Sequence, residues 1–441
     1  MPSTPLRWLA FALCIAALGC KDDSSASTDA SQPNDGAVSA MSGAGGASGA
    51  GAGSGAGGSA GTSGSGGAMD GSLDDAAAND SGMDAAGSSA MDGGTDASPP
   101  ASSKAYVYIG SGYWGGAEPG RIAVYELEDD GTLSFVDRID AGGASGIASF
   151  MVADRSRRLL YVADEGNGAL QRYTVDPATG RLTLDDEVDV SGSPVYVSLD
   201  SSGDTLLSAS YDEGLVRLFA VGGDGFVEPA SDSENTGAET HSIVVSADDA
   251  FAYVCNKSTG TLSQFAFDPA THALTALDPA TIASPGPRHP AFSADGRFLY
   301  VVSEPEDSVR IYARAADGTL SLSDEIARLP VGEAGPGAHV LLSAAGYLYV
   351  SNRGPSNSIA VYSVDATNGA LTLVEHEPTM GETPRNFTFD PQGRFLLVGN
   401  QDSQNVVVFS VDSATGKLEY LNTVDVEGSP FFVGVYTFPL D

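Results

Sequence analysis

The chain has 441 residues, of which 58 are Asp or Glu and 21 are Lys or Arg, so its formal net charge at pH 7 is −37. Binding to nucleic acid is led by Lys and Arg on phosphates, so this charge argues against a nucleic-acid partner. Of the three cysteines, Cys14 and Cys20 fall in the first 20 residues, which leaves Cys255 without a partner for an intrachain disulfide.

Residues 1–20 have the pattern of an export signal. Arg7 supplies a positive start and residues 8–18 form an apolar run, which is shorter than the ~20 apolar residues of a membrane-spanning helix. The run leads into "ALGC", which resembles the lipobox of bacterial lipoproteins, where the cysteine, here Cys20, is lipidated. We therefore predict a protein exported and lipid-anchored to a bacterial membrane, in the periplasm or at the cell surface, with ordinary secretion as the alternative.

Residues 21–103 are of low complexity. These 83 residues are rich in Gly, Ala, Ser and Asp and contain no aromatic side chain. Such a segment cannot bury enough apolar surface to offset its chain entropy, so we expect it to be disordered. As a flexible coil it would have an r.m.s. reach of about 50 Å, which suits a linker between a membrane anchor and a folded domain.

Residues 104–441 contain one unit repeated seven times. Each unit has an apolar segment whose central position recurs at intervals of 46 to 53 residues: Ile109, Val162, Ser208, Val254, Val301, Val350 and Val398. Alternating strands follow each segment, separated by turn sequences such as "DPATG" and "DSATG". Four short strands in a repeat of this length are typical of a β-propeller blade, and a β-sandwich would not explain such regular intervals.

The two ends of residues 104–441 are complementary. The domain begins with a second strand, "YVYIGSG", and ends with a first strand, "SPFFVGVYTF", at residues 429–438. We therefore predict an all-β, seven-bladed β-propeller of four-stranded blades, with the C-terminal strand joining the first blade to close the ring. Closure would remove the open sheet edges that invite aggregation.

The repeat also predicts which side chains gather at one mouth of the ring. The second strand of a unit ends three residues after its central position, where six units carry Glu165, Tyr211, Lys257, Glu304, Arg353 and Gln401. The strand before it begins with Ser149, Val195, His241, Arg288, Ala338 or Arg385, and His289 and His339 stand one place further on. Sevenfold pseudosymmetry would bring both sets together.

Register counting places these residues in pairs. Asp295 and Gly296 form a two-residue turn, and counting outward from it brings Arg288 opposite Ser303 and beside Glu304. Cross-strand and diagonal neighbours lie about 5 to 8 Å apart. The same count brings Arg385 near Gln401.

Such residues can be purely structural, because the inner strands of a propeller line a wet channel and an Arg beside a Glu can be a neutralised pair. Their combination argues for a site. Residues 104–441 have 47 acidic and 19 basic side chains, a net charge near −28, yet three guanidinium groups, an imidazole and a carboxylate are expected at one mouth. These cationic groups predict a site for an anionic or carboxylate-bearing small molecule.

Three stretches carry a family resemblance: "GPRHPAFSADGRFLYVVSE", "LYVSNRGPSNSIAVYSVD" and "PRNFTFDPQGRFLLVGNQ". Over residues 104–441 the chain resembles the seven-bladed lactonase family, which includes the propeller-type 6-phosphogluconolactonase and the fungal carboxy-cis,cis-muconate cyclase. The resemblance implies that His241, Arg288, Glu304 and Arg353 occupy positions of the family's active site. Arg385 and Gln401 fall in segments typical of the family.

We therefore predict a lactonase-family, 6-phosphogluconolactonase-like hydrolase that opens a small lactone. Glu304 or His241 would take a proton from water, while Arg288 and Arg353 would hold the substrate anion or the developing oxyanion. We assign substrate contacts to six further residues: His289, Arg385, Gln401, Glu165, Tyr211 and His339. A sugar phosphate is a cytoplasmic metabolite, so the export signal argues against a phosphorylated substrate.

No metal or cofactor is expected, because residues 104–441 contain no HExxH, no GxSxG and no calcium-spaced Asp loop. We expect a monomer that contacts the membrane only through its N-terminal lipid. The alternative is a non-catalytic surface propeller that binds a small anionic ligand, a glycan or a protein, because the fold alone does not set the function.

Overall fold

The computed structural model describes residues 104–113, 119–225 and 227–440. All the described residues belong to one compact unit. The predicted signal peptide, the predicted lipidation site at Cys20 and the predicted linker lie outside the described residues. Within residues 104–440 as described, no helix is long and apolar enough to cross a membrane.

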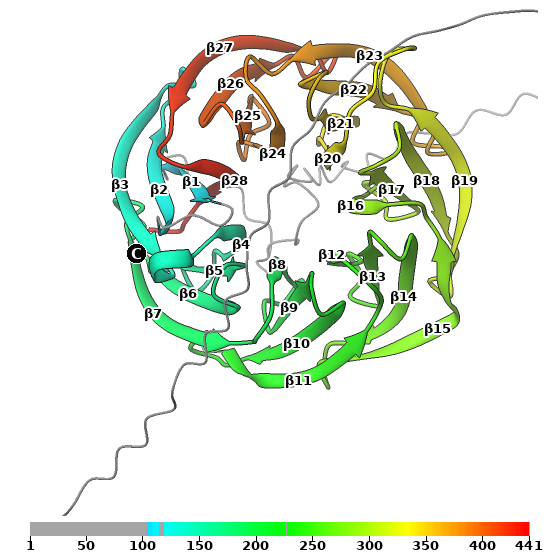
Figure 1. The fold of residues 1–441 in the computed structure, drawn as a ribbon, viewed down its shortest axis with the longest axis horizontal. Coiled ribbons are helices and arrows are strands. Elements are labelled where there is room, and N and C mark those ends of the chain that lie inside the picture. Colours follow the sequence, from blue (N-terminus) through cyan, green and yellow to red (C-terminus); the bar gives the residue numbers. More distant parts are fainter. Residues whose placement is uncertain (1–103, 114–118, 226, 441) are drawn as a thin grey trace, which may run out of the picture. The chain divides into compact units, whose positions relative to one another are not determined.

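Seven antiparallel sheets of four strands each form a ring (Figure 1). The strands nearest the centre are β28 (Ser429–Thr437), β4 (Ala148–Asp154), β8 (Pro194–Leu199), β12 (Thr240–Val245), β16 (Pro287–Phe292), β20 (Gly337–Leu342) and β24 (Pro384–Phe389). The second strands are β1 (Ala105–Gly112), β5 (Leu159–Asp164), β9 (Thr205–Ser210), β13 (Phe251–Asn256), β17 (Phe298–Ser303), β21 (Tyr347–Asn352) and β25 (Phe395–Asn400).

The third strands are β2 (Gly120–Leu127), β6 (Ala169–Val175), β10 (Leu215–Val221), β14 (Thr261–Asp268), β18 (Ser308–Arg314), β22 (Ser358–Val364) and β26 (Asn405–Val411). The outermost strands are β3 (Leu133–Ala141), β7 (Leu182–Asp189), β11 (Val227–Asn235), β15 (Ala273–Ala283), β19 (Leu320–Ala327), β23 (Leu371–Pro378) and β27 (Leu418–Asp425). A single turn of 3-10 helix, η1 (Gly143–Ser145), precedes β4.

The ring is closed by the two ends of the domain. The C-terminal β28 pairs with the N-terminal β1 from Ala105 opposite Thr437 to Gly112 opposite Ser429. The predicted seven-bladed propeller, its four-stranded blades and its mode of closure are therefore confirmed.

Tyrosines on the second strands connect neighbouring blades. The hydroxyl of Tyr253 donates to the carbonyl oxygen of Gly318 in the next blade at 2.6 Å, and Tyr349 makes the same bond to Gly416 at 2.6 Å. Gly318 has a φ of +83°, and a Cβ built on it would lie 2.1 Å from the ring of Phe251. Glycine is required in this turn both for its conformation and for the close approach of the neighbouring blade.

A β-bulge lies near one end of every innermost strand, and it corrects the predicted register. Pro287 pairs with Ser303 and His289 with Val302, so Arg288 is the extra residue of the bulge. The prediction that Arg288 lies opposite Ser303 is wrong by one place, because a count from the turn does not include the bulge. The corresponding extra residues are Ser149, Val195, His241, Arg385 and Phe431, and in β20 one of Ala338 and His339. A bulge re-aims side chains, and three of these bulge residues, Val195, His241 and Arg385, line the pocket at the centre of the ring.

Candidate active site

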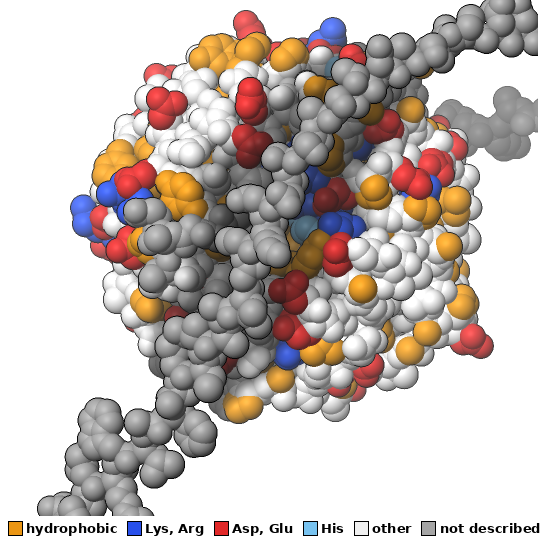
Figure 2. Space-filling view, viewed as in Figure 1, with side chains coloured by type: hydrophobic (Ala, Val, Ile, Leu, Met, Phe, Trp, Pro, Cys, Tyr) orange, Lys and Arg blue, Asp and Glu red, His pale blue; other side chains and the backbone are white. Residues whose placement is uncertain are grey.

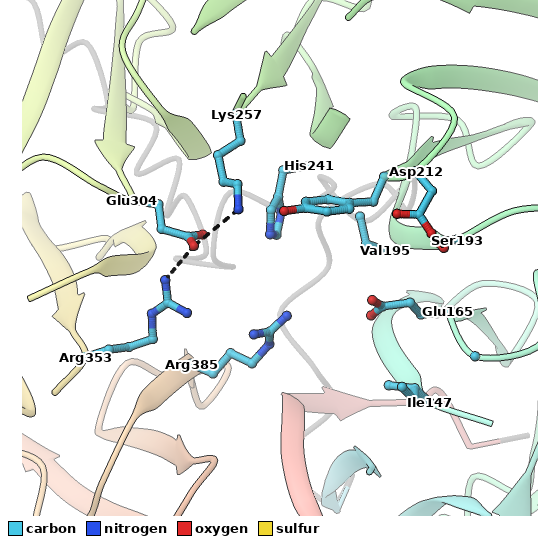
Figure 3. Close-up of a pocket in the computed structure, with 12 residues that line it drawn as sticks. Ile147, Glu165, Ser193, Val195, Asp212, His241, Lys257, Glu304, Arg353 and Arg385 are labelled. Carbon is cyan, nitrogen blue, oxygen red and sulfur yellow. Dashed lines mark hydrogen bonds and ion pairs between the residues drawn. The ribbon is translucent and has the colours of Figure 1, made fainter. Parts of the chain in front are cut away.

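A pocket of about 370 Å³ lies at the centre of the ring (Figure 3). Its size is at the lower end of the ~300–1,000 Å³ usual for small-molecule sites. Its lining combines bulge residues with residues that follow the second strands: Ile147, Glu165, Gly166, Ser193, Val195, Tyr211, Asp212, His241, Lys257, Glu304, Arg353 and Arg385. Figure 2 shows basic, acidic and histidine side chains together in the hollow between the described blades.

Each of three blades pairs its bulge residue with the residue after its second strand. Arg288 forms an ion pair with Glu304, and Ser149 donates a hydrogen bond to Glu165. Arg385 donates to the side-chain oxygen of Gln401 at 3.5 Å, and its guanidinium lies 4.7 Å from the ring of Phe431. The bulge therefore decides which group faces each of these side chains.

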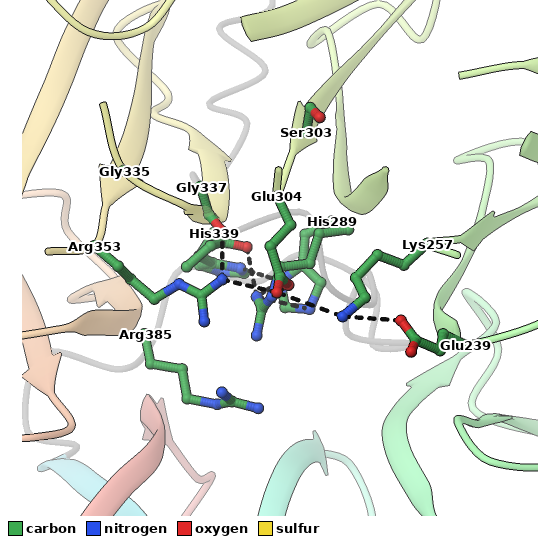
Figure 4. A network of polar contacts seen from close by, with 12 residues as sticks. Glu239, Lys257, His289, Ser303, Glu304, Gly335, Gly337, His339, Arg353 and Arg385 are labelled. Atoms are coloured by element: carbon green, nitrogen blue, oxygen red, sulfur yellow. Dashed lines mark hydrogen bonds and ion pairs between the residues drawn. The ribbon is translucent and has the colours of Figure 1, made fainter. Parts of the chain in front are cut away.

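Glu304 is surrounded by three cations (Figures 3 and 4). Its Oε2 lies 3.0 Å from Nε of Arg288, and Figure 4 shows Arg353 and Lys257 on either side of it. Its Oε1 lies 3.1 Å from Nη2 of Arg353 and 3.5 Å from Nζ of Lys257. Lys257 also contacts Glu239 at 2.9 Å, and its Nζ lies 5.1 Å from the ring centroid of Tyr211. One carboxylate thus holds three basic side chains in place.

These cations keep Glu304 ionised. Burial alone would raise the pKa of Glu304, but the charges of Arg288 and then Arg353 outweigh it and hold that pKa well below its usual range. Arg288 has only 2% of its side chain exposed and keeps its charge, because a guanidinium does not lose its proton in proteins. The buried guanidinium of Arg288 is thus neutralised by Glu304, which is the member of the pair that lines the pocket.

Three histidines are packed next to this cluster. Nδ1 of His289 lies 2.6 Å from Nδ1 of His339, and the ring of His241 lies 5.1 Å from that of His289. Burial, followed by the charge of Arg288, lowers the pKa of His241 and of His289 well below their usual value. The same causes lower the pKa of His339 to about 3. All three imidazoles are therefore neutral at pH 7.

His241 is the histidine that lines the pocket. Its Nδ1 is buried and has no hydrogen-bond partner in the part of the chain that the structure describes. Buried polar atoms normally have a partner, so an unpaired ring nitrogen beside a pocket is suited to a ligand or a water molecule.

The opposite side of the pocket carries acidic and hydroxyl groups. Glu165 and Asp212 line it, and Ser193 donates a hydrogen bond to Asp212. Burial raises the pKa of Glu165, against the opposing charge of Arg385. In Figure 3 the carboxylate of Glu165 and the guanidinium of Arg385 both point into the space between the two sides. The pocket therefore has a cationic side and an acidic side.

The family model described as lactonase, 7-bladed beta-propeller, matches residues 106–435. The chain belongs to this lactonase family. It is 31% identical over 344 residues to the 6-phosphogluconolactonase of Pectobacterium carotovorum, which covers 75% of this chain and 98% of that protein. It is 28% identical over 337 residues to that of Bacillus subtilis, covering 72% and 95%.

Solved structures give the same assignment. The structure of a periplasmic gluconolactonase of Pseudomonas aeruginosa superimposes on this lactonase-family propeller with a TM-score of 0.69 and 30% identity, covering 76% of this chain and 100% of that chain. The predicted family resemblance and a lactonase-family hydrolase function are confirmed by these relatives and by the family model.

The lactonase pocket brings together part of the predicted set. Six predicted residues line it: Glu165, Tyr211, His241, Glu304, Arg353 and Arg385. The other four are not in its lining. Arg288 reaches it through Glu304, and Gln401 through Arg385. His289 and His339 are buried against Arg288, which contacts His289 and donates to the carbonyl oxygen of Ala338.

Sequence reasoning did not select Lys257, Ser193 or Asp212 as site residues. Lys257 occupies the same repeat position as Glu304, so the repeat contained the signal needed to find it. Ser193 precedes β8 and Asp212 follows Tyr211, and loop residues have no register from which to place them. Among the described residues of this lactonase, no group of three or more His, Cys, Asp or Glu side chains could hold a metal ion.

Proposed function

We propose that this propeller hydrolyses a small sugar-derived lactone in the pocket between Glu304 and Glu165. The observation that carries the proposal is the convergence of basic side chains on one pocket of a strongly acidic domain. Lys257, Arg353 and Arg385 line this pocket, and Arg288 lies behind Glu304, with which it forms an ion pair. A lactone becomes more negative at its carbonyl oxygen as water attacks. Fixed cations in a partly buried pocket stabilise that charge without reorganising.

The structure supports separate roles for the predicted catalytic residues. Glu304 holds Arg288 and Arg353 in position, and its own low pKa makes it a poor proton acceptor. Arg353, which lines the pocket, binds the substrate anion or the developing oxyanion, and Arg288 supports the position of Glu304 from behind. His241 is neutral and can donate its single N–H to the carbonyl oxygen, as a neutral imidazole does in other enzymes that polarise carbonyl groups.

The substrate class follows from the two sides of the pocket together with the export signal. Curated relatives are 6-phosphogluconolactonases, and a structural neighbour is a periplasmic gluconolactonase. Because residues 1–20 predict export and a lipid anchor at Cys20, we propose an unphosphorylated or carboxylate-bearing aldonolactone as the substrate. Its hydroxyl groups would face Ser193 and Asp212.

The test is turnover by the purified mature protein on a panel of unphosphorylated, carboxylate-bearing and phosphorylated aldonolactones. We expect hydrolysis above the spontaneous rate, and an Arg353→Met variant should raise KM about 10- to 100-fold, since hydrogen bonds to charged groups contribute about 1.5–3 kcal/mol. Arg310→Met is the matched control, because Arg310 is similarly buried but pairs with Glu306 and Glu325 outside the pocket. If no lactone is turned over while calorimetry still detects aldonate binding, the protein is a binding propeller.

A further inference from the structure

The pocket contains two half-buried glutamates at the same position of the repeat, and they have different partners. Both oxygens of Glu304 contact cations. Glu165 accepts one hydrogen bond at Oε2, from the hydroxyl of Ser149. Its Oε1 receives neither a hydrogen bond nor an ion pair from any residue that the structure describes. Both carboxylate oxygens of Glu304 thus have cationic partners, whereas Oε1 of Glu165 is available to accept a hydrogen bond in the pocket.

The two carboxylates face the pocket from opposite sides (Figure 3). A lactone bound between them would place its carbonyl oxygen toward Arg353 and His241. The open space on its other side is bounded by Glu165. A water molecule held by the unused oxygen of Glu165 would then lie on the face of the carbonyl carbon that is away from the cations.

The groups around Glu165 set its proton affinity. Burial raises its pKa most strongly, and the charge of Arg385 on β24 is the main opposing influence. The Ser149 hydrogen bond and the more distant Arg288 lower its pKa further, while Asp212 raises it, and the net shift is upward. General bases work best when their pKa is near the working pH. Two carboxyl groups whose environments separate their pKa values are a common sign of divided catalytic roles.

We propose that Glu165 is the general base of this propeller: its carboxylate takes the proton from the water that attacks the lactone, an inference that rests on the proposed hydrolysis. The water oxygen bonds to the carbonyl carbon, its proton passes to Glu165, and the C=O electron pair moves onto the oxygen facing Arg353. When the tetrahedral adduct collapses, the ring C–O bond breaks and the leaving oxygen takes the proton from Glu165. The hydroxy acid is released and the carboxylate is restored.

Glu165→Gln tests the proposal, because it keeps the size of the side chain and can still accept a hydrogen bond from Ser149. We expect kcat to fall about 10²- to 10⁴-fold, the usual contribution of general acid–base catalysis. The acidic limb of the pH profile of kcat/KM should also disappear. Glu187→Gln is the matched control: Glu187 lies in the same blade, bonded to Gln171 and outside the pocket, and this variant should keep the wild-type profile.

Ser149→Ala provides a second, milder test. Since the Ser149 hydrogen bond lowers the pKa of Glu165, its loss should move the acidic limb to higher pH while turnover at the plateau stays within a few fold. Aldonate binding by calorimetry would show that the pocket of each variant is intact.

The outcomes separate the two proposals. A wild-type protein that turns over no lactone overturns the proposed hydrolysis and this assignment with it. A wild type that is active, with Glu165→Gln retaining both its rate and its acidic limb, overturns only the assignment. In that case Glu304 or His241 would be the proton acceptor. Loss of the limb in Glu165→Gln together with its upward shift in Ser149→Ala supports Glu165.

Discussion

The blade β4–β7 and the blade β16–β19 present the same backbone to the pocket but different chemistry. Each has a bulge in its innermost strand and a glutamate after its second strand. In the first blade the bulge residue is Ser149, and the pKa of Glu165 is raised by burial. In the second it is Arg288, and the pKa of Glu304 is lowered by the adjacent charges despite burial. The repeat fixes where a side chain stands, and the bulge residue determines how that side chain ionises.

The difference continues one residue further along each innermost strand. After Ser149 comes Phe150, whose ring stacks on Tyr196 with centroids 4.0 Å apart. After Arg288 comes His289, which contacts His339. One blade therefore supports its bulge with an apolar contact and the other with a polar one. The residue that follows the bulge is thus a titratable imidazole in the β16–β19 blade and a phenyl ring in the β4–β7 blade.

The largest effect is expected when the unfolding free energy of Glu304→Gln is compared with that of Glu165→Gln. Removing the charge of Glu304 leaves Arg288 buried without its closest counter-charge, and breaking a buried ion pair costs about 3 kcal/mol or more. We expect the unfolding free energy to fall by about that amount in urea titrations. Glu165→Gln should change it by no more than about 1 kcal/mol, because the amide keeps the bond from Ser149.

Near-UV circular dichroism of both variants provides the control that the native fold is retained. Equal losses of stability would contradict the contrast between the two blades, since they would mean that both carboxylates have the same structural role.

The fold could be predicted from the sequence because a propeller has a characteristic repeat length and a characteristic pattern of short strands. The similar intervals from Ile109 to Val398 predicted the number of blades, and the complementary end strands predicted how the ring closes. These features depend on local alternation and on counting, neither of which requires knowledge of tertiary contacts.

The site was predictable only in part. Pseudosymmetry brought Glu165, Glu304 and Arg353 to one pocket, but the bulge at Arg288 changed its register, and no turn signal in the sequence marks a bulge. The different states of the two glutamates depend on desolvation and on cations from other blades, which act across more than 40 residues of sequence. Counting along one hairpin cannot supply that information.

A single substitution can give the β4–β7 blade the bulge chemistry of the β16–β19 blade. Ser149→Arg would place a guanidinium beside Glu165, as Arg288 stands beside Glu304. An opposite charge at this distance lowers a carboxyl pKa by about one unit or more. We expect the acidic limb of kcat/KM to move down by about one pH unit and the plateau rate to fall about tenfold, because the base is weakened. A pH-rate series on the lactone used for the wild type measures both.

Ser149→Gln is the control for bulk, because glutamine extends into the pocket without a charge. It should slow turnover without shifting the limb to lower pH. If glutamine and arginine shift the limb alike, the pKa of Glu165 is set by something other than the charge of the bulge residue.

The smallest expected effect is a change in the pH dependence of stability, and it tests the histidines packed against Arg288 of the β16–β19 blade. His339 has a folded pKa of about 3, below the ~6.5 of an unfolded histidine. The stability from burying it neutral is therefore fully present above pH 6.5 and is lost as pH falls below that value. Between pH 7 and pH 5.5 one such histidine lowers the unfolding free energy by about 1.3 kcal/mol.

His339→Asn should reduce the wild-type pH dependence of the unfolding free energy by that amount. Phe387→Leu, which alters the ring packed 5.1 Å from His339, should instead lower stability equally at both pH values. An unchanged pH dependence in His339→Asn would mean that the polar support of the Arg288 blade does not titrate, and the contrast with the apolar support under Ser149 would then have no consequence for stability.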